Sequence, residues 1–239
     1  MKIIEGLNLA DFDLELSNFI QKDDHTVFVI KENWDYMLAH DFQEVILDRV
    51  YADKTQRVYI ICNHPHCLTL GRGLQKKLTP DISLIDFDES LREKLDIPIH
   101  NIKRGGGVTF HYPGQLVFYP IISLENQKLA VMDFLRGTIR KFKTILEERF
   151  HLENLDADNE LIGLWCGSRK IASMGLSTRR FVTYHGLALN LYQDEKMSKI
   201  LRTVYPCGLS GAIYQSIDEL LPLESDLFNK ITDSLTANI

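Results

Sequence analysis

Three extended runs follow one another along residues 161–166, 169–176 and 181–191, with only turn residues between them. Each run carries apolar side chains, and Gly167-Ser168 and residues 177–180 separate them. Strands joined by such short connections favour antiparallel pairing. This feature predicts an antiparallel or mixed sheet rather than a regular alternation of parallel strands and helices.

Further strands and helices are predicted on both sides of these runs. Strands are expected at residues 57–62, 68–70 and 97–103, and residues 108–110 and 116–122 are expected to pair around the turn at Tyr112-Pro113-Gly114-Gln115. Helical spacing of apolar residues predicts helices at 35–51, 128–150 and 196–204, the last ending before Pro206. Shorter helices are expected at 215–221 and 224–238, and residues 74–94 read as a loop with a short helix.

The longest of these helices, 128–150, is amphipathic. Its expected buried side consists of Leu129, Met132, Phe134, Leu135, Ile139, Phe142, Ile145 and Leu146. With 239 residues, no internal repeat and no low-complexity segment, we expect one α+β (α/β) domain over residues 1–239. In this domain helices pack against a mixed or antiparallel sheet.

Composition narrows the classes of function. The formal net charge of −6 argues against a general nucleic-acid binder, because such proteins usually carry a basic excess. No apolar run of about 18 residues predicts a membrane span, and the first residues lack a signal peptide. We therefore expect a cytoplasmic protein whose cysteines, Cys62, Cys67, Cys166 and Cys207, are free thiols.

Residues 104–120 carry the most informative motif. Arg104 precedes Gly105-Gly106-Gly107, and an extended run with His111 follows. Glycine lacks a Cβ, so a ligand can lie close to this backbone. The segment matches neither a dinucleotide fingerprint nor a P-loop. A tight turn or a β-bulge would also explain the glycines.

Two residues are candidates for nucleophilic chemistry. Cys207 lies between Pro206 and Gly208, and its thiol needs a neighbouring base or cation to form a thiolate at neutral pH. Lys170 could supply that group, because partial burial makes a lysine a usable base. Strand alternation would place Lys170 on one face with Ala172 and Met174. The alternatives are a buried apolar cysteine and a solvated lysine at a strand edge.

Histidines offer two further candidates. His185 precedes Gly186 in an extended run and could support Cys207 as a base, or could be a satisfied histidine at a strand end. Cys62, His64, His66 and Cys67 fall within six residues. Structural zinc sites usually have a longer interval between two pairs of ligands, so the end of a buried strand is the simpler interpretation, and no metal is assigned.

Taken together, four blocks resemble the octanoyltransferases of lipoate biosynthesis, the lipoyl(octanoyl) transferases of the LipB type. They are His64-Pro65 with Thr69-Leu70-Gly71-Arg72; Arg104-Gly105-Gly106 with Val108-Thr109-Phe110-His111 and Pro113-Gly114-Gln115-Leu116-Val117; Lys170-Ile171-Ala172-Ser173 with Gly175; and residues 185–190 closed by Pro206-Cys207-Gly208. The likeness covers about residues 35–211. It implies the fold of biotin and lipoate protein ligases.

The resemblance also implies an activity without a cofactor. The octanoyl group would pass from octanoyl-acyl carrier protein to a specific lysine of a lipoyl domain, in the E2 subunits of 2-oxo acid dehydrogenases or in glycine-cleavage H protein. Cys207 would carry the acyl thioester, and Lys170 would lower the pKa of its thiol. The acyl substrate would be lined by Arg104, Gly105, Gly106, Gly107, Val108, Thr109, Phe110, His111, Ser173, Met174, Gly175, Gly186, Leu187 and Ala188.

Some residues depart from the family pattern. Gly107 stands where many members carry a polar residue, Cys62-Asn63 precedes His64 where an acidic residue is common, and Cys166 is an additional thiol. Two other functions remain open: a lipoate protein ligase that uses ATP, and a non-catalytic homologue that only binds acyl groups or acyl carrier protein. The presence of both Cys207 and Lys170 disfavours the second.

Overall fold

The computed structural model describes residues 1–72, 87, 89–157, 162–201 and 213–239. The strands are β1 (Phe19–Gln21), β2 (Thr26–Lys31), β3 (Arg57–Cys62), β4 (Cys67–Leu70), β5 (Ile99–Asn101), β6 (Val108–His111), β7 (Gln115–Ile122), β8 (Leu155–Asp156), β9 (Gly163–Cys166), β10 (Arg169–Arg179) and β11 (Val182–Asn190). The α-helices are α1 (Tyr36–Ala52), α2 (Leu124–Gln127), α3 (Val131–Phe150), α4 (Glu195–Leu201) and α5 (Leu227–Asn238). Short 3-10 helices lie at Lys2–Ile4, Leu9–Phe12, Leu16–Asn18, Glu89–Leu91 and Ile217–Glu219.

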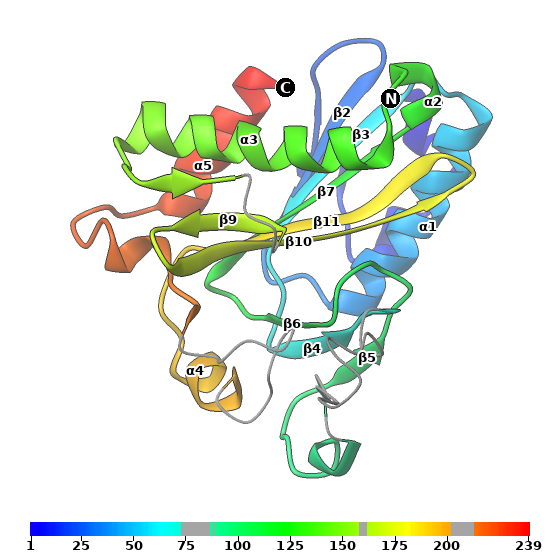
Figure 1. Ribbon diagram of the computed structural model, residues 1–239. Coiled ribbons are helices and arrows are strands. Elements are labelled where there is room, and N and C mark those ends of the chain that lie inside the picture. The colour runs from blue at the N-terminus through cyan, green and yellow to red at the C-terminus, as the bar shows by residue number, and fades with distance from the viewer. Residues whose placement is uncertain (73–86, 88, 158–161, 202–212) are drawn as a thin grey trace.

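The strands form two sheets (Figure 1). The larger has eight strands in the order β1-β2-β3-β7-β11-β10-β9-β8, and the smaller has the order β5-β4-β6. Neighbours in the larger sheet are antiparallel except for β2 and β3, which are parallel. The predicted mixed sheet is therefore confirmed, as is the antiparallel order of β9, β10 and β11.

One predicted pairing is wrong. The runs before and after Pro113 were expected to form a hairpin, but β6 pairs with β4 in the small sheet and β7 lies between β3 and β11 in the large one. All eight residues of β7 are buried. A strand buried on both faces belongs at the centre of a covered sheet, where β3 and β11 satisfy both of its edges.

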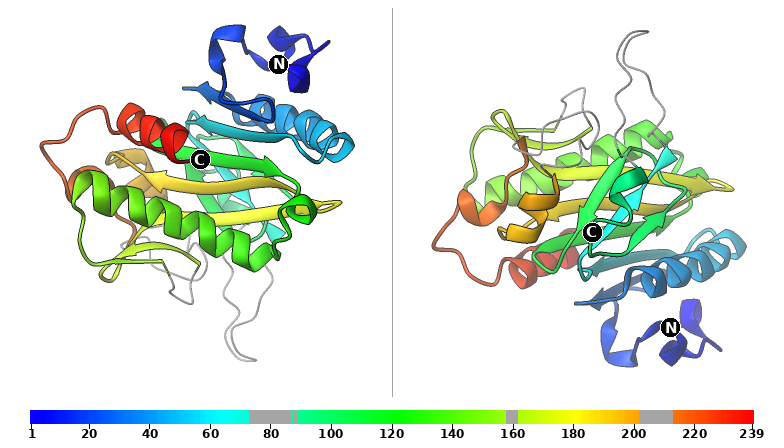
Figure 2. Two further views of the ribbon diagram at one scale, coloured as in Figure 1. Left: turned by 90° about the horizontal axis from the view of Figure 1, so that it is seen from above. Right: turned by 90° about the horizontal axis from the view of Figure 1, so that it is seen from below.

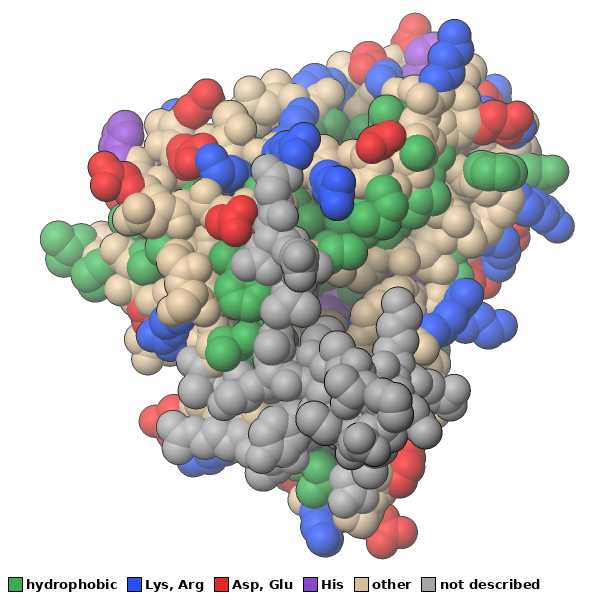
Figure 3. Space-filling model, viewed as in Figure 1, with side chains coloured by type: hydrophobic (Ala, Val, Ile, Leu, Met, Phe, Trp, Pro, Cys, Tyr) green, Lys and Arg blue, Asp and Glu red, His purple; other side chains and the backbone are tan. Residues whose placement is uncertain are grey.

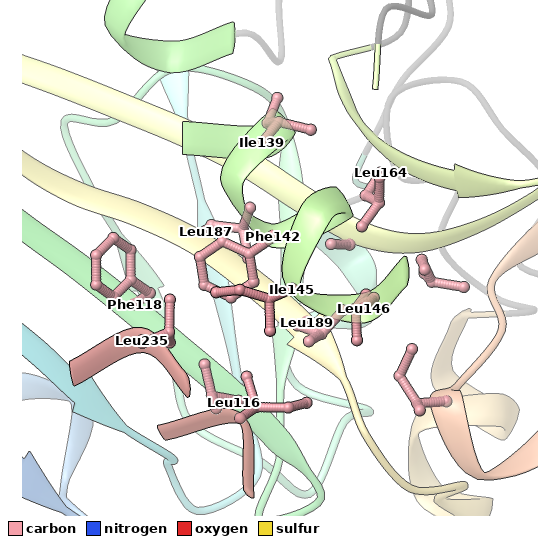
Figure 4. Close-up of a cluster of buried hydrophobic side chains, with 14 of the residues drawn as sticks. Leu116, Phe118, Ile139, Phe142, Ile145, Leu146, Leu164, Leu187, Leu189 and Leu235 are labelled. Carbon is pink, nitrogen blue, oxygen red and sulfur yellow. The ribbon is translucent and has the colours of Figure 1, made fainter. Parts of the chain in front are cut away.

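Helices cover both faces of the large sheet (Figure 2). α3 and α5 pack on one face, where the side chains of alternate strand residues form the main hydrophobic core (Figure 4). The members labelled there are Leu116, Phe118, Ile139, Phe142, Ile145, Leu146, Leu164, Leu187, Leu189 and Leu235. α1 packs on the other face, against residues such as Val58, Ile60 and Tyr119. The alternation of period two thus separates the two cores.

The helices begin where their local chemistry allows. The carboxylate of Asp35 accepts hydrogen bonds from the backbone of Met37 and Leu38 and so caps α1.

In α3 the expected face is buried from Leu135 onward, but Leu129 and Met132 are 42% and 45% exposed, contrary to prediction. Leu129 precedes the helix, and the first turn of α3 lies outside the packed core.

The small sheet has its own apolar contacts. Leu68, Val108 and Phe110 pack with Met197 and Ile200 of α4, at the bottom of Figure 1.

Among the described residues, no helix is long and apolar enough to cross a membrane. On the face shown in Figure 3, basic and acidic side chains are interspersed.

Candidate active site

The candidate site lies between the two sheets, on the face of β10 and β11 that turns away from α3. Two cavities adjoin there and share Thr109 and Ser173 as wall residues. The first is lined by Val108, Thr109, Phe110, Gln115, Ser173, Asn190, Met197, Leu201 and Tyr214. The second is lined by Tyr36, Arg104, Thr109, His111, Val117, Tyr119, Ser173, Gly175, His185, Gly186, Leu187 and Ala188.

The glycines after Arg104 connect the two sheets. The Gly105 amide donates to the Leu176 carbonyl of β10 at 3.1 Å, and the Gly71 amide after β4 donates to the Gly107 carbonyl at 3.0 Å. A Cβ at Gly71 would lie 2.4 Å from the Gly106 carbonyl oxygen, and one at Gly175 would lie 2.8 Å from that of Gly105. Both backbones can approach this closely only without side chains.

Arg104 is held at the join between the sheets. It is buried, and its Nη2 donates at 2.8 Å to both the carbonyl and the hydroxyl of Thr69. Its Nη1 donates to the carbonyl of Gly105 at 3.0 Å. These bonds fix a guanidinium in the wall of the second cavity.

His111 has a defined tautomer. Its Nδ1 lies 2.8 Å from Gln115 Oε1, an amide oxygen that can only accept, so Nδ1 carries the proton. Burial, together with the charges of His64 and Arg104, lowers the pKa of His111 well below its usual value. The ring is therefore neutral at physiological pH. Its unprotonated Nε2 lies 3.4 Å from the Thr69 hydroxyl.

His64 is fixed by the same logic. Its Nδ1 donates to the Trp34 carbonyl at 2.8 Å, and its Nε2 accepts from the Tyr119 hydroxyl at 2.8 Å. Burial lowers the pKa of His64 to about 4. The ring of Tyr36, at the start of α1, stacks on His111 with centroids 5.3 Å apart. His64 lies behind Tyr36, His111 and Tyr119, whose rings line the second cavity together with the Arg104 guanidinium.

His185 differs from these two histidines. It is 1% exposed, and neither ring nitrogen has a hydrogen-bond partner among the described residues. Its backbone has a φ of 58° and its amide N–H donates to Gln43 Oε1 at 2.9 Å. Burial lowers its pKa well below the usual value, followed by the effects of His40 and Arg104. His185 lines the second cavity as a neutral ring.

Lys170 is buried at the edge of β10. Only 4% of it is exposed, its Nζ donates to the Ile162 carbonyl at 3.0 Å, and the ammonium lies 5.3 Å from the ring centroid of Trp165. The alternative of a solvated lysine is therefore wrong. A β-bulge between Lys170 and Ala172 places both Ile171 and Ala172 in the core. This bulge breaks the alternation of side chains along β10. The prediction that Lys170 shares a face with Ala172 and Met174 is therefore wrong.

Cys207, the predicted nucleophile, lies outside the described residues. Leu201 and Tyr214, which lie on either side of it in sequence, both line the first cavity. Tyr214 also forms a bridge with Lys170, and the Gln215 amide donates to the Lys170 carbonyl at 3.0 Å. The described chain that follows Cys207 therefore lies beside the backbone of Lys170, and Leu201 on the other side of Cys207 lines the same cavity as Tyr214.

The three described cysteines are poor thiolates. Burial raises the pKa of Cys67 to about 12 and that of Cys62 well above its usual value. Burial also raises the pKa of the half-buried Cys166 thiol, which lies 3.7 Å from the Glu153 carbonyl. A thiol that stays protonated is a weak nucleophile.

The side chains of the Cys62, His64, His66 and Cys67 cluster contact different partners. His64 contacts the Cys62 Sγ at 3.6 Å as well as Tyr119, whereas His66 Nε2 lies 2.8 Å from the Asp194 carboxylate. Within the described parts of the chain, no three His, Cys, Asp or Glu residues are placed to hold a metal ion. This segment follows a buried strand, as its alternative interpretation had it.

Most of the predicted substrate-lining residues come together. Arg104, Val108, Thr109, Phe110, His111, Ser173, Gly175, Gly186, Leu187 and Ala188 line one or both cavities. The side chain of Met174 packs instead into the core beneath α3, because it alternates with Ser173 and Gly175. Eight wall residues were missed: Tyr36, Gln115, Val117, Tyr119, Asn190, Met197, Leu201 and Tyr214. Gln115 and Asn190 lie within quoted motifs, and Asn190 shares the period-two face of Gly186 and Ala188.

Residues 35–236 match the family described as the lipoyl protein ligase A/B catalytic domain. The chain belongs to this family. A chloroplastic octanoyltransferase of Arabidopsis thaliana is 33% identical over 204 residues, covering 83% of this chain and 68% of the relative. An octanoyltransferase of Nostoc sp. is 33% identical over 190 residues, covering 78% of this chain and 79% of the relative. These relatives confirm the predicted octanoyltransferase family and its acyltransferase activity.

Solved structures support the fold. A lipoate-protein ligase A bound with ATP has a TM-score of 0.60 at 12% identity, covering 88% of this chain and 81% of that one. A bipartite lipoate protein ligase from Thermoplasma acidophilum has a TM-score of 0.58 at 15% identity, covering 90% and 81%. At such identities the likeness shows a shared fold alone, and it confirms the fold predicted from the motifs.

Proposed function

We propose that this chain transfers an octanoyl group from octanoyl-acyl carrier protein to a specific lysine of a lipoyl domain. The acceptor would be carried by the E2 subunits of 2-oxo acid dehydrogenases or by glycine-cleavage H protein. The observation that carries the proposal is Lys170, a buried lysine whose backbone pairs with Tyr214, a wall residue of the first cavity that follows Cys207 in the chain. The octanoyltransferase relatives supply the class of acyl group.

The first half of the reaction would load the enzyme. Lys170 takes the proton of the Cys207 thiol, and the thiolate attacks the carbonyl carbon of the carrier thioester. The carrier thiolate leaves and takes this proton from Lys170, and the octanoyl group remains on Cys207. Exchange of one thioester for another is nearly isoenergetic, so this step needs no ATP.

The second half would form the amide. The acceptor lysine must lose a proton before it attacks, and Lys170 is the nearby base that receives it. The amine then attacks the acyl-Cys207 carbonyl, the Cys207 thiolate leaves, and a more stable amide results. The three described cysteines cannot easily replace Cys207, because burial raises their pKa values.

The two cavities have suitable walls for the acyl chain. Gly175, Gly186 and Ala188 leave space along β10 and β11, and His111 and His185 line the second cavity as neutral rings. The Arg104 guanidinium in the same wall is bonded to Thr69 and Gly105. His185 would then support substrate binding rather than act as the base for Cys207. Because α5 contributes Leu227, Ile231 and Leu235 to the same core as α3, we infer one domain over residues 1–239.

The test is a comparison of donors. Purified protein and a lipoyl domain are incubated with octanoyl-acyl carrier protein alone, or with octanoate and ATP. We expect octanoylation of the lipoyl-domain lysine, followed by mass spectrometry, only with the carrier protein. Acylation from octanoate and ATP alone would establish a ligase instead, and binding without transfer would establish a non-catalytic acyl-binding protein.

A further inference from the structure

A pair of amide side chains in the wall of the first cavity has no part in the reaction as described so far. Gln115, at the start of β7, and Asn190, at the end of β11, lie opposite each other in the register of these strands. Both are buried, at 3% and 5% exposure, and both line the cavity. Hydrogen bonds hold each side chain and determine the positions of its amide oxygen and its amide nitrogen.

The orientation of Gln115 follows from its neighbours. Its Nε2 lies 3.1 Å from the Phe110 carbonyl, an atom that can only accept, so this end is the amino group. The second Nε2 hydrogen points to Asn190 Oδ1, also at 3.1 Å. Its Oε1 accepts from His111. All the hydrogen-bonding hydrogens of the Gln115 amide are thereby used.

Asn190 is oriented in the same way but keeps one donor. Its Oδ1 accepts from Gln115, and its Nδ2 donates to the Gln215 carbonyl at 3.3 Å. An amide nitrogen carries two hydrogens. Among the described residues the second one has no hydrogen-bond acceptor. A buried donor without an acceptor costs free energy, so this N–H is available to a hydrogen-bond acceptor in the cavity.

The available donor is connected to the backbone of Lys170 through Gln215. Gln215 accepts from Asn190 through its carbonyl and donates to the Lys170 carbonyl through its amide at 3.0 Å. One residue therefore ties the Asn190 side chain to the backbone of Lys170. Ser173, which belongs to the same cavity as Asn190, marks the connection to the second cavity, where the acyl chain would lie.

We propose that the Asn190 amide is the side-chain hydrogen-bond donor for the carbonyl oxygen of the reacting acyl group. This inference rests on the proposed octanoyl transfer. When the nucleophile adds to the carbonyl carbon, the π electron pair of the C=O bond moves to the oxygen, and Asn190 donates its second N–H to the resulting oxyanion. When the leaving group departs, the pair returns and the C=O bond reforms. The same donor serves both the loading of the enzyme and the transfer to lysine.

The surrounding bonds suit this role. Donors that are already fixed before the reaction need no reorganisation when charge develops, which is the basis of stabilisation by an oxyanion hole. The Gln115 N–H that binds Asn190 Oδ1 also polarises the amide and strengthens its remaining N–H as a donor. Gln115 is thus a positioning residue for Asn190, whereas Asn190 contacts the reacting atoms.

The experiment compares two reactions of the same thiol. In a Cys166→Ser background, Asn190→Ala and the isosteric Asn190→Asp are assayed for acylation by octanoyl-acyl carrier protein in single turnovers. They are also assayed for alkylation of Cys207 by iodoacetamide, a displacement that forms no oxyanion. Asn18→Ala is the matched control, because the Asn18 amide also donates to a backbone carbonyl, that of Ile30 at 3.0 Å, but away from the cavities. Thermal unfolding is measured for each variant.

We expect both Asn190 variants to lose about a hundred- to a thousand-fold in the acylation rate and in kcat, with KM little changed. Alkylation of Cys207 should stay within about twofold of the parent, as should every reaction of Asn18→Ala. An equal fall in alkylation and acylation would overturn the inference, because Asn190 would then only hold the fold around the thiol. Acylation at the parent rate would overturn it too. If the parent itself takes no octanoyl group from the carrier, the proposed function fails, and this inference fails with it.

Discussion

The two faces of β10 and β11 differ in the side chains that neighbouring residues place on them. On one face Ala172, Met174 and Leu176 join Leu187 and Leu189 in the core beneath α3 and α5. On the other face the residues are Ser173, Gly175, Gly186, Ala188 and Asn190, and the surface they form lines two cavities. On the first face large apolar side chains fill the core and stabilise the fold, whereas the second face leaves space and places polar groups. Substitutions on the two faces should therefore separate stability from activity.

The largest expected effect is that of Lys170→Met, which keeps the length of the side chain but removes the amine. We expect octanoyl transfer at neutral pH to fall by about a hundred- to ten-thousand-fold, the usual contribution of a positioned base. Alkylation of Cys207 should also slow at pH 7 and approach the wild-type rate at higher pH.

The control for that variant is Lys141→Met. The Lys141 Nζ also donates to a backbone carbonyl, that of Asn238 at 2.7 Å, but it belongs to α3 on the opposite side of the sheet. Its activity should match wild type. Equal losses in the two variants would remove Lys170 from the chemistry.

Leu189→Ala tests the core face. Leu189 is fully buried among the residues of α3 and α5 shown in Figure 4. Removal of its side chain should lower the free energy of unfolding by about 2–5 kcal/mol, measured by urea denaturation. At a temperature where the variant is folded, kcat should be close to wild type. A large fall in kcat without loss of stability would contradict the division between the faces.

Acid should lower the free energy of unfolding, because buried histidines must then be protonated. Since the pKa of His64 is about 4 in the folded protein and about 6.5 in the unfolded chain, the unfolded chain binds more protons between these values. The contribution of His64 is therefore complete above pH 6.5 and is lost as the pH falls toward 4, by about 2 kcal/mol between pH 7.5 and 5. The lowered pKa values of His111 and His185 act in the same direction.

The measurement is the free energy of unfolding in urea at both pH values. His64→Asn should reduce the pH dependence by about 2 kcal/mol, whatever its effect at pH 7.5. An unaltered slope in His64→Asn would mean that His64 is not held neutral by burial.

The smallest expected effect is that of Ala188→Leu. Ala188 precedes Leu189 in β11 and lies on the opposite, cavity-lining face. Ala188 lines the second cavity, so a larger side chain should take space from the acyl chain. We expect a loss of about tenfold in kcat/KM for octanoyl-acyl carrier protein, the scale of one or two methylenes in an apolar pocket. A shorter acyl donor should recover part of the loss. An effect that is independent of acyl length would argue against this cavity as the chain-binding site.

Local patterns predicted much of the fold. The residues of α1, β3 and the β9–β11 group show clear periodicity, and their bounds were predicted closely. By contrast, the sequence did not show that β6 and β7 belong to different sheets, because that choice depends on β3, β4 and β11, which are distant in the chain. The short edge strand β1 and its neighbour β2 were also missed.

For the site, motifs identified most wall residues but not their geometry. The glycines after Arg104 were interpreted as space for a ligand, yet Gly105, Gly106 and Gly107 are not among the residues that line the two cavities, and Gly105 and Gly107 bond to the backbones of Leu176 and Gly71 instead. The β-bulge beside Lys170 could not be read from alternation, which assumes regular pairing. Asn190 gained its significance only from the hydrogen bonds that orient it.

The central claim is that octanoate passes through a thioester on Cys207. Intact-mass spectrometry after acid quenching, with octanoyl-acyl carrier protein and no acceptor, tests it most directly. The account predicts one octanoyl group on wild type, removed by neutral hydroxylamine and lost on addition of a lipoyl domain, and none on Cys207→Ala. An octanoyl group on Cys207→Ala, or transfer to the lipoyl domain at the wild-type rate by that variant, would contradict the account.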